Sequence, residues 1–187
     1  MNEIAKLGGK LLLIAAVAGL ALGFTNALTE GPIAEQRIME ANAARARVLP
    51  AAEAGFEEVD NANAELDEVY RGLASGGETA GYTGKITVRG YGGPIEVTVG
   101  VDMSGTVTGI NVGGSDFSET AGLGAKTKDA AFTDQFAGLS AADPSGIAVK
   151  ADGGLIDAVS SATISSRAVS RGVRTVCEAL TELIKEG

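Results

Sequence analysis

The sequence predicts an α+β protein in which a single N-terminal transmembrane helix precedes a small antiparallel sheet with packed helices. Three features predict this fold: a long uncharged N-terminal run, several segments in which apolar and polar residues alternate, and a C-terminal apolar stripe at helical spacing. The 187 residues suffice for one membrane anchor and one compact domain. We expect three parts: a cytoplasmic tip and anchor at residues 1–30, a juxtamembrane helical region at 31–75, and a globular domain at 76–187.

The N-terminal run begins after Lys10 and ends before Glu30. Its nineteen uncharged residues would span roughly 28 Å as a helix, at about 1.5 Å per residue, which matches one bilayer crossing. A secretory signal peptide is the alternative, because Thr25-Asn26-Ala27 weakly resembles a cleavage site. The run is longer than a typical signal core, so we favour a retained anchor.

The charges that flank the run predict its orientation. Lys6 and Lys10 precede it, whereas acidic residues follow it, so the positive-inside rule places the N-terminus in the cytoplasm. Three basic residues on the far side, Arg37, Arg45 and Arg47, oppose this assignment. On balance we expect a single-pass protein of the cell (inner) membrane with its globular domain on the extracytoplasmic side.

The residues after the anchor have a helical composition. Gly31-Pro32 predicts a break followed by a new helix start, and the Ala-rich residues 33–48 are expected to be helical until Pro50 ends the helix. Residues 51–73 are rich in Ala, Glu and Leu and predict a second helix, which the turn cluster Ser75-Gly76-Gly77 would end.

From Tyr82 the apolar residues follow a period of two, which predicts half-buried strands. They mark three strands: Ile86 and Val88; Ile95, Val97, Val99 and Val101; Val107, Ile110 and Val112. Gly92-Gly93-Pro94 and Ser104-Gly105 are expected to form the connecting turns of a meander.

The last segment, from about Thr163, changes to a helical period. Its apolar stripe consists of Val169, Val173, Cys177, Leu180 and Ile184. We expect this helix to pack on the sheet. Because Cys177 lies on the stripe, it is expected to be a small buried side chain rather than a reactive thiol.

Charge and composition exclude several functions. A net charge of −9 argues against nucleic-acid binding, which needs clustered Lys and Arg. With no histidine and one cysteine, the chain lacks intramolecular disulfides, Cys or His metal clusters and any histidine base. We therefore expect no catalytic residue and no metal site, and infer that a cofactor, or else carboxylates and hydroxyls, must supply any chemistry.

Two segments have the composition of ligand-binding sites. Five hydroxyl residues lie at the expected start of the last helix: Ser160, Ser161, Thr163, Ser165 and Ser166. Helix capping requires one or two hydroxyls, and the free N–H groups of a helix start also bind phosphate, so both functions remain open. The Gly-rich residues 119–126 form either a plain surface loop or a backbone that approaches a planar ligand, with Leu123 against its plane and Lys126 supplying positive charge.

Taken together, the motifs resemble the FMN-binding domain family, and within it the G subunits of the Rnf ion-translocating electron-transport complex. The resemblance rests on the anchor, on Val-Leu-Pro at 48–50, on Gly-Tyr-Gly-Gly-Pro-Ile at 90–95, on Glu-Thr-x-Gly-Leu-Gly at 119–124, and on Asp-x-x-Ser-x-Ala-Thr at 157–163 followed by Ser. Two positions depart from the family pattern: Ser161 replaces a usual glycine, and Ala121 replaces a usual proline.

The resemblance implies a covalent flavin. In the family the last threonine of the motif, here Thr163, accepts FMN from a flavin transferase as a phosphoester. The expected cofactor-binding residues are Thr163 with Ser160, Ser161, Ala162, Ile164 and Ser165 at the helix start, and Glu119, Thr120, Gly122, Leu123, Gly124 and Lys126 in the loop.

The resemblance also implies a place in a complex. The chain would be a redox subunit of a ferredoxin:NAD⁺ oxidoreductase coupled to Na⁺ or H⁺ translocation, inactive on its own, with partner subunits of the A, B, C, D and E types. Two alternatives stand beside it: a C-type subunit of the sodium-pumping NADH:quinone reductase, for which this chain is short, and an anchored module that only binds partners.

Overall fold

The computed structural model describes residues 2–60 and 64–186. The elements are, in chain order, α1 (Asn2–Val48), β1 (Gly55–Glu58), β2 (Glu68–Leu73), β3 (Thr79–Arg89), β4 (Pro94–Asp102), β5 (Val107–Gly113), η1 (Gly124–Lys128), α2 (Ala130–Thr133), η2 (Asp134–Phe136), η3 (Pro144–Gly146), η4 (Lys150–Asp152) and α3 (Thr163–Glu186). The described chain divides into two units, one ending at Ala41 and one beginning at Asn42.

The first unit consists of most of helix α1, which is continuous from Asn2 to Val48. The predicted break at Gly31-Pro32 is therefore wrong. A proline inside a helix removes one backbone hydrogen bond, and Gly31 is a weak helix former, but the better helix formers before Gly31 and after Pro32 continue the helix here. The most apolar 18-residue window of α1 has a mean hydropathy of 2.1 and no buried residues, so the helix is long and apolar enough to cross a membrane. It ends two residues before Pro50, as predicted.

The second predicted helix, at residues 51–73, is also wrong, because this segment forms β1 and β2. Both strands join the sheet, where β2 pairs antiparallel with β3. A Cβ added to Gly72 would lie 2.6 Å from Leu49 Cδ2, so glycine leaves the space for that side chain. Pairing with β3 and burial of Val69 outweigh the helix propensity of Ala and Glu. The boundary expected after residue 75 thus falls within the β2–β3 connection.

The predicted meander is confirmed. The five strands lie in the order β1-β2-β3-β4-β5, and every neighbouring pair is antiparallel. The β3–β4 turn contains Gly92-Gly93, and the β4–β5 turn contains Ser104-Gly105. Because side chains alternate across a strand, register places Gly84, Val99 and Ile110 on one face of the sheet.

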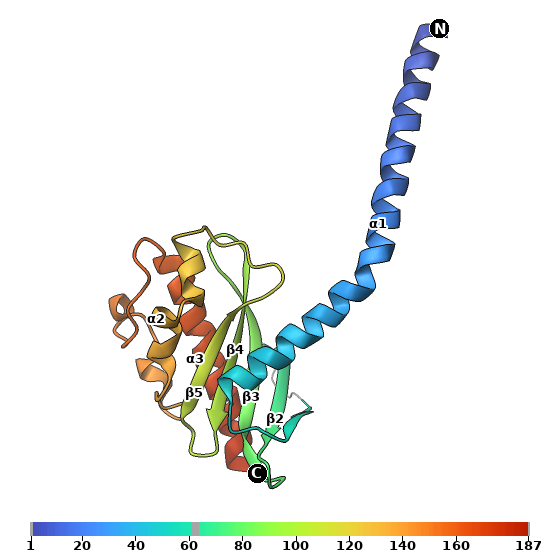
Figure 1. Ribbon diagram of the computed structural model, residues 1–187. Coiled ribbons are helices and arrows are strands. Elements are labelled where there is room, and N and C mark those ends of the chain that lie inside the picture. Colours follow the sequence, from blue (N-terminus) through green and yellow to red (C-terminus); the bar gives the residue numbers. More distant parts are fainter. Residues whose placement is uncertain (1, 61–63, 187) are drawn as a thin grey trace. The chain divides into compact units, whose positions relative to one another are not determined.

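This apolar face, called here the inner face, carries helix α3 (Figure 1). Two glycines permit the close packing: a Cβ on Gly84 would lie 2.6 Å from Val176 Cγ1, and one on Gly172 would lie 2.8 Å from Val88 Cγ1. The predicted stripe is confirmed, with Val169, Val173, Cys177 and Leu180 fully buried and Ile184 partly buried. Burial, with a smaller contribution from Glu178, raises the pKa of the Cys177 thiol to about 12, as expected for an unreactive cysteine.

The opposite face, called here the outer face, is polar and is covered by the end of α1. Backbone around Val48 approaches Gly100 so closely that a Cβ there would overlap the Val48 carbonyl oxygen. That carbonyl accepts a hydrogen bond from the Thr108 hydroxyl. Arg47 donates to Asn111 Oδ1 at 2.8 Å. Polar contacts therefore act together with the buried side chains of Val48 and Leu49 to hold residues 42–49 on the sheet.

The strongest of these polar contacts centre on Glu68. Its carboxylate pairs with Arg45 and with Lys85 Nζ, the latter at 2.6 Å. Arg45 is buried, and its guanidinium lies 3.7 Å from the centroid of the Tyr70 ring. Burial alone would raise the pKa of Glu68, but the hydrogen bonds and charges of Lys85 and Arg45 outweigh it and lower that pKa. The ionised carboxylate thus links α1, β2 and β3.

Candidate functional site

A tight turn leads into helix α3. The Ala162 amide donates to the Val159 carbonyl at 2.9 Å, which leaves Ser160 and Ser161 at the two central positions. Ser161 has φ of +61° and is the one non-glycine residue with a positive φ among those the structure describes. A positive φ at the second central position is typical of a type II turn, where glycine is preferred. The departure from the family motif therefore falls on a position that favours glycine.

The five hydroxyls of this segment have different environments. Ser165 and Ser166 are buried: Ser165 donates to Glu119 Oε2 at 2.8 Å, and Ser166 donates to the Ala162 carbonyl while accepting from the Val159 amide, both at 3.0 Å. Ser160 and Ser161 are exposed, and Thr163 is half-buried. Within the described chain, none of these hydroxyls accepts a hydrogen bond from an amide of the first turn of α3, so the capping account lacks its expected contact.

The Gly-rich loop folds back on itself before helix η1. Leu123 and Ala125 amides both donate to the Thr120 carbonyl, each at 3.1 Å. Gly122 has φ of +78°, a conformation that L side chains rarely adopt. The loop leaves the Leu123 side chain 40% exposed, and η1 packs against α3. The hydrogen bonds of the loop backbone therefore leave the Leu123 side chain partly exposed, beside the start of α3.

Glu119 brings the hairpin, the loop and the helix start together. Its Oε1 accepts from the Gly92 amide at 3.0 Å, and its Oε2 accepts from the Ser165 hydroxyl. A Cβ on Gly90 would overlap Oε1, and a Cβ on Gly124 would overlap Oε2. The three motifs singled out in the sequence thus meet at one buried carboxylate, 9% exposed.

A cavity of about 440 Å³ opens where these segments meet. It is lined by nine of the twelve predicted cofactor-binding residues: Glu119, Thr120, Leu123, Gly124, Ser161, Ala162, Thr163, Ile164 and Ser165. The other three, Ser160, Gly122 and Lys126, lie outside the lining although they are close in sequence. Sequence reasoning missed Tyr91, which also lines the cavity and is 73% exposed. It lies in the β3–β4 turn, beyond the last strand pair Arg89–Pro94, so the expected role as a cross-strand partner is wrong.

The lining fits a flavin mononucleotide in size and chemistry. Ligand pockets usually enclose about 300–1,000 Å³ and combine apolar walls with a few polar groups. Tyr91, Leu123 and Ile164, the last 54% exposed, give apolar surface, while Thr163 gives a hydroxyl at the first residue of α3. The N–H groups at the start of a 24-residue helix favour a phosphate there.

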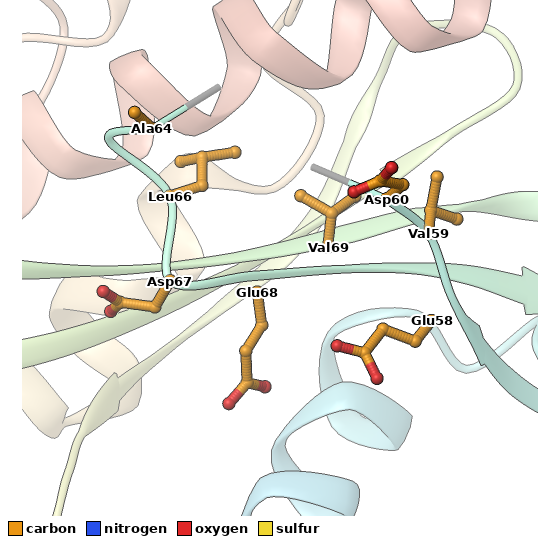
Figure 2. Close-up of a pocket in the computed structure, with 8 residues that line it drawn as sticks. All are labelled: Glu58, Val59, Asp60, Ala64, Leu66, Asp67, Glu68 and Val69. Atoms are coloured by element: carbon orange, nitrogen blue, oxygen red, sulfur yellow. The ribbon is translucent and has the colours of Figure 1, made fainter. Parts of the chain in front are cut away.

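A second hollow, of about 610 Å³, lies beside β2 and has the opposite character. Its lining includes four acidic residues, Glu58, Asp60, Asp67 and Glu68. Figure 2 shows Glu68 on the side of β2 opposite to Val69, with Asp67 and Glu58 also directed away from the apolar side chains. Carboxylates repel a phosphate, so this larger hollow does not fit a nucleotide.

Comparison with known proteins defines the class of the domain. Residues 90–178 match the family described as FMN-binding domain. The fold is shared with NqrC of Shewanella oneidensis (TM-score 0.52, 19% identity, 70% of both chains). It is shared as well with the C subunit of the Na⁺-translocating NADH-quinone reductase of Parabacteroides distasonis (TM-score 0.51, 23% identity, 63% of both chains). At these identities the likeness shows the fold alone.

Curated relatives narrow the class further. The G subunit of the Na⁺-translocating ferredoxin:NAD⁺ oxidoreductase complex of Acetobacterium woodii is 38% identical over 96% of this chain and 93% of its own length. The G subunit of the ion-translocating oxidoreductase complex is 35% identical in Methanosarcina acetivorans (90% and 89%) and 34% identical in Escherichia coli K12 (93% and 89%). The chain belongs to this family of G subunits of ion-translocating oxidoreductase complexes, which confirms the family that the motifs indicated.

Proposed function

We propose that this chain carries FMN covalently on Thr163 and transfers electrons within an Rnf-type ferredoxin:NAD⁺ oxidoreductase that couples the reaction to Na⁺ or H⁺ translocation. The observation that carries the proposal is the environment of the five hydroxyls. Ser165 and Ser166 are buried and engaged in hydrogen bonds, and Ser160 lies outside the cavity. Of the five, Thr163 and Ser161 line the cavity without a side-chain hydrogen bond in the described part of the chain, and of the two only Thr163 belongs to α3.

The environment of Thr163 suits a phosphoester. Its hydroxyl makes no hydrogen bond to any residue in the described part of the chain, so attachment there breaks none of those contacts. In the proposed attachment, Thr163 Oγ1 forms a bond to the phosphorus of a pyrophosphate-linked flavin donor. The bond from that phosphorus to the rest of the donor breaks, and the hydroxyl proton leaves with the released phosphate monoester. A flavin transferase would catalyse this step.

The remaining lining residues would hold the flavin. Amides at the start of α3 favour its phosphate, and Tyr91, Leu123 and Ile164 provide apolar surface for its ring system. FMN would supply reversible electron transfer, while the chain would supply position and electrostatics. Gly122 would contribute through loop shape, and Ser160 and Lys126 are proposed contacts only if the flavin extends beyond the cavity lining.

We further propose that α1 anchors the protein as a single pass, with the N-terminus in the cytoplasm and the FMN domain on the extracytoplasmic side. The length and hydropathy of α1 support the anchor, and the flanking Lys6 and Lys10 support the sidedness. A covalent bond would retain the flavin where cytoplasmic FMN is not available. The expected partners are the A, B, C, D and E subunits of the complex.

Intact-mass measurement tests the attachment. The full chain, co-expressed with a flavin transferase, is expected to gain the mass of one FMN less one water, because a phosphoester forms. Thr163→Val should abolish this gain, while Ser160→Ala, which removes a neighbouring hydroxyl outside the cavity, should keep it. An unmodified wild-type chain, or a modified Thr163→Val chain, would contradict the proposal.

Thiol labelling tests the sidedness. A cysteine introduced at the exposed Ser115 gives a reactive probe, whereas the native Cys177 is buried and stays silent. The proposal predicts that a membrane-impermeant reagent labels Ser115→Cys from the extracytoplasmic side of intact cells. Labelling only after the cytoplasm is opened would contradict the proposed orientation.

A further inference from the structure

We propose that Glu119 is a positioning residue that fixes the first turn of α3, and with it the Thr163 hydroxyl, against the β3–β4 hairpin. The inference rests on the proposed attachment at Thr163 and assigns Glu119 a role other than contact with the flavin. Sequence analysis placed Glu119 among the cofactor contacts, but both of its oxygens are engaged within the protein.

The two hydrogen bonds of Glu119 join segments that are distant in sequence. Oε1 accepts from the Gly92 amide, 27 residues away, and Oε2 accepts from the Ser165 hydroxyl, 46 residues away. The Ser165 side chain is itself buried. Hydrogen bonds to a charged group are stronger than neutral ones, about 1.5–3 kcal/mol against about 1 kcal/mol. One carboxylate therefore connects the hairpin to the first turn of the helix.

The backbone around Glu119 is shaped to this carboxylate. A Cβ on Gly90 would overlap Oε1, and a Cβ on Gly124 would overlap Oε2 and lie 3.0 Å from the Ser165 hydroxyl oxygen. The hairpin and the loop thus enclose the carboxylate from two sides. Glycine at both positions has a steric reason that does not involve a ligand, because a side chain there would collide with a carboxylate whose two oxygens are both hydrogen-bonded within the protein.

The position of Ser165 explains how Glu119 acts on Thr163. Residues two apart on a helix point about 200° apart, because each residue turns about 100°. Glu119 holds the first turn through the buried Ser165, and Thr163, which lines the same cavity, is the more exposed of the two residues. A fixed first turn gives the Thr163 hydroxyl a fixed direction, which in-line attack on a phosphorus requires.

A second tether on the same helix supplies a matched control. Arg167, one turn from Thr163, forms two hydrogen bonds to the Asp152 carboxylate, at 2.7 and 2.6 Å. Both side chains are more than 40% exposed, so solvent weakens the pair. Asp152→Ala therefore removes a tether of α3 without disturbing the buried carboxylate.

The test measures the initial rate of flavin attachment to the full chain in detergent, by intact mass, with purified flavin transferase. Glu119→Ala is expected to slow attachment on the order of 10- to 100-fold, the usual cost of a misplaced reacting group. Glu119→Gln should react within about twofold of the wild-type rate, because its amide can accept from Gly92 and donate to Ser165. Asp152→Ala should also react at nearly the wild-type rate.

Two results would overturn the inference: attachment to Glu119→Ala at the wild-type rate, or a folded Glu119→Gln as slow as Glu119→Ala. If Glu119→Ala fails to fold, Ser165→Ala removes one of the two bonds and must itself slow attachment. Amide hydrogen exchange gives a readout that needs no flavin. The hydrogen-bonded amides of residues 166–168 should exchange faster in Glu119→Ala than in wild type or Glu119→Gln, while β4 is unchanged. If the wild-type chain accepts no flavin, the proposed function fails, and this exchange pattern still decides the role of Glu119.

Discussion

The two faces of the sheet are stabilised in different ways. On the inner face, branched apolar side chains and two glycines pack against 24 residues of α3. On the outer face, residues around the end of α1 lie on the strands. Two apolar side chains, Val48 and Leu49, are buried there, and ion pairs of Glu68 and further hydrogen bonds supply the remaining contacts. Apolar burial depends neither on the titration of a charged group nor on Debye screening, whereas ion pairs depend on both.

This contrast between the two faces explains why the functional site lies at an end of the inner face. Apolar packing fixes α3 from Ala168 onward, and the hydrogen bond between Ser165 and Glu119 holds its first turn, so Thr163 lies on a supported element. The cavity lies at that end of the inner face, beside Thr163. The outer face holds the anchor end of the second unit with contacts that can be weakened by acid. Mutations on the two faces should therefore differ in both size and pH dependence.

The largest effect is expected on the inner face. Leu180→Ala should lower the free energy of unfolding by about 2–5 kcal/mol, because Leu180 is fully buried and its removal leaves a cavity against Gly84. Urea unfolding at pH 7 and at pH 4 should give the same loss. Leu155→Ala, at an exposed site, is the control and should change stability by less than about 0.5 kcal/mol. A strongly pH-dependent loss for Leu180→Ala would contradict the proposed difference between the two faces.

A smaller effect is expected where the inner face ends at the cavity. Gly124→Ala should destabilise the protein by about 1–3 kcal/mol, because the new methyl would overlap the Glu119 carboxylate. Gly76→Ala, where an added Cβ meets nothing closer than 4.0 Å, is the matched control for loss of a glycine. Thermal unfolding of both variants gives the measurement, and equal stability of the two would show that the site tolerates a shifted carboxylate.

On the outer face, Glu68→Gln should lower stability at pH 7 by about 1 kcal/mol, since Glu68 is partly exposed and solvent screens its pairs. The folded protein lowers the pKa of Glu68 below its usual 4.5. Its stabilising contribution is therefore fully present above that value and is lost as the pH falls through 4.5 toward the lower folded pKa. Urea unfolding across this range should show wild type and variant converging in acid. A difference that stays constant to pH 3 would contradict this account.

The smallest effect concerns the turn before α3. Ser161→Gly relieves a positive φ that costs an L residue roughly 1–2 kcal/mol, but it adds about 0.5–1 kcal/mol of unfolded-chain entropy. The net gain should be about 0.5 kcal/mol, with an unchanged rate of flavin attachment. A rise in melting temperature without a change in attachment rate would show that the turn limits stability and not function. A loss of stability would mean that Ser161 makes a favourable contact that offsets its strain.

Part of the fold was predictable from the sequence because its signals are local. The stripe from Val169 to Leu180 and the alternation in β3, β4 and β5 predict the correct elements, and α3 begins at the predicted Thr163. The signals failed where the outcome depends on distant partners. β1 and β2 have helical composition, and only pairing with β3 makes them strands.

The candidate site was predictable as a set of segments but not as an arrangement. Spacing identified the hydroxyl run, yet only the fold shows that Ser165 and Ser166 are buried and hydrogen-bonded whereas Thr163 is half-buried. Tyr91 was missed because a hairpin turn already explained its motif. The sequence alone also could not predict the proposed role of Glu119, because that role depends on contacts with residues 27 and 46 positions away.

The most direct test of the central claim is flavin fluorescence of the denatured full chain in a gel, because only a covalently bound flavin remains on the chain under those conditions. The account predicts a fluorescent band for the wild-type chain produced with a flavin transferase, and none for Thr163→Val at equal protein load. A fluorescent Thr163→Val band, or a dark wild-type band, would contradict covalent attachment of FMN at Thr163.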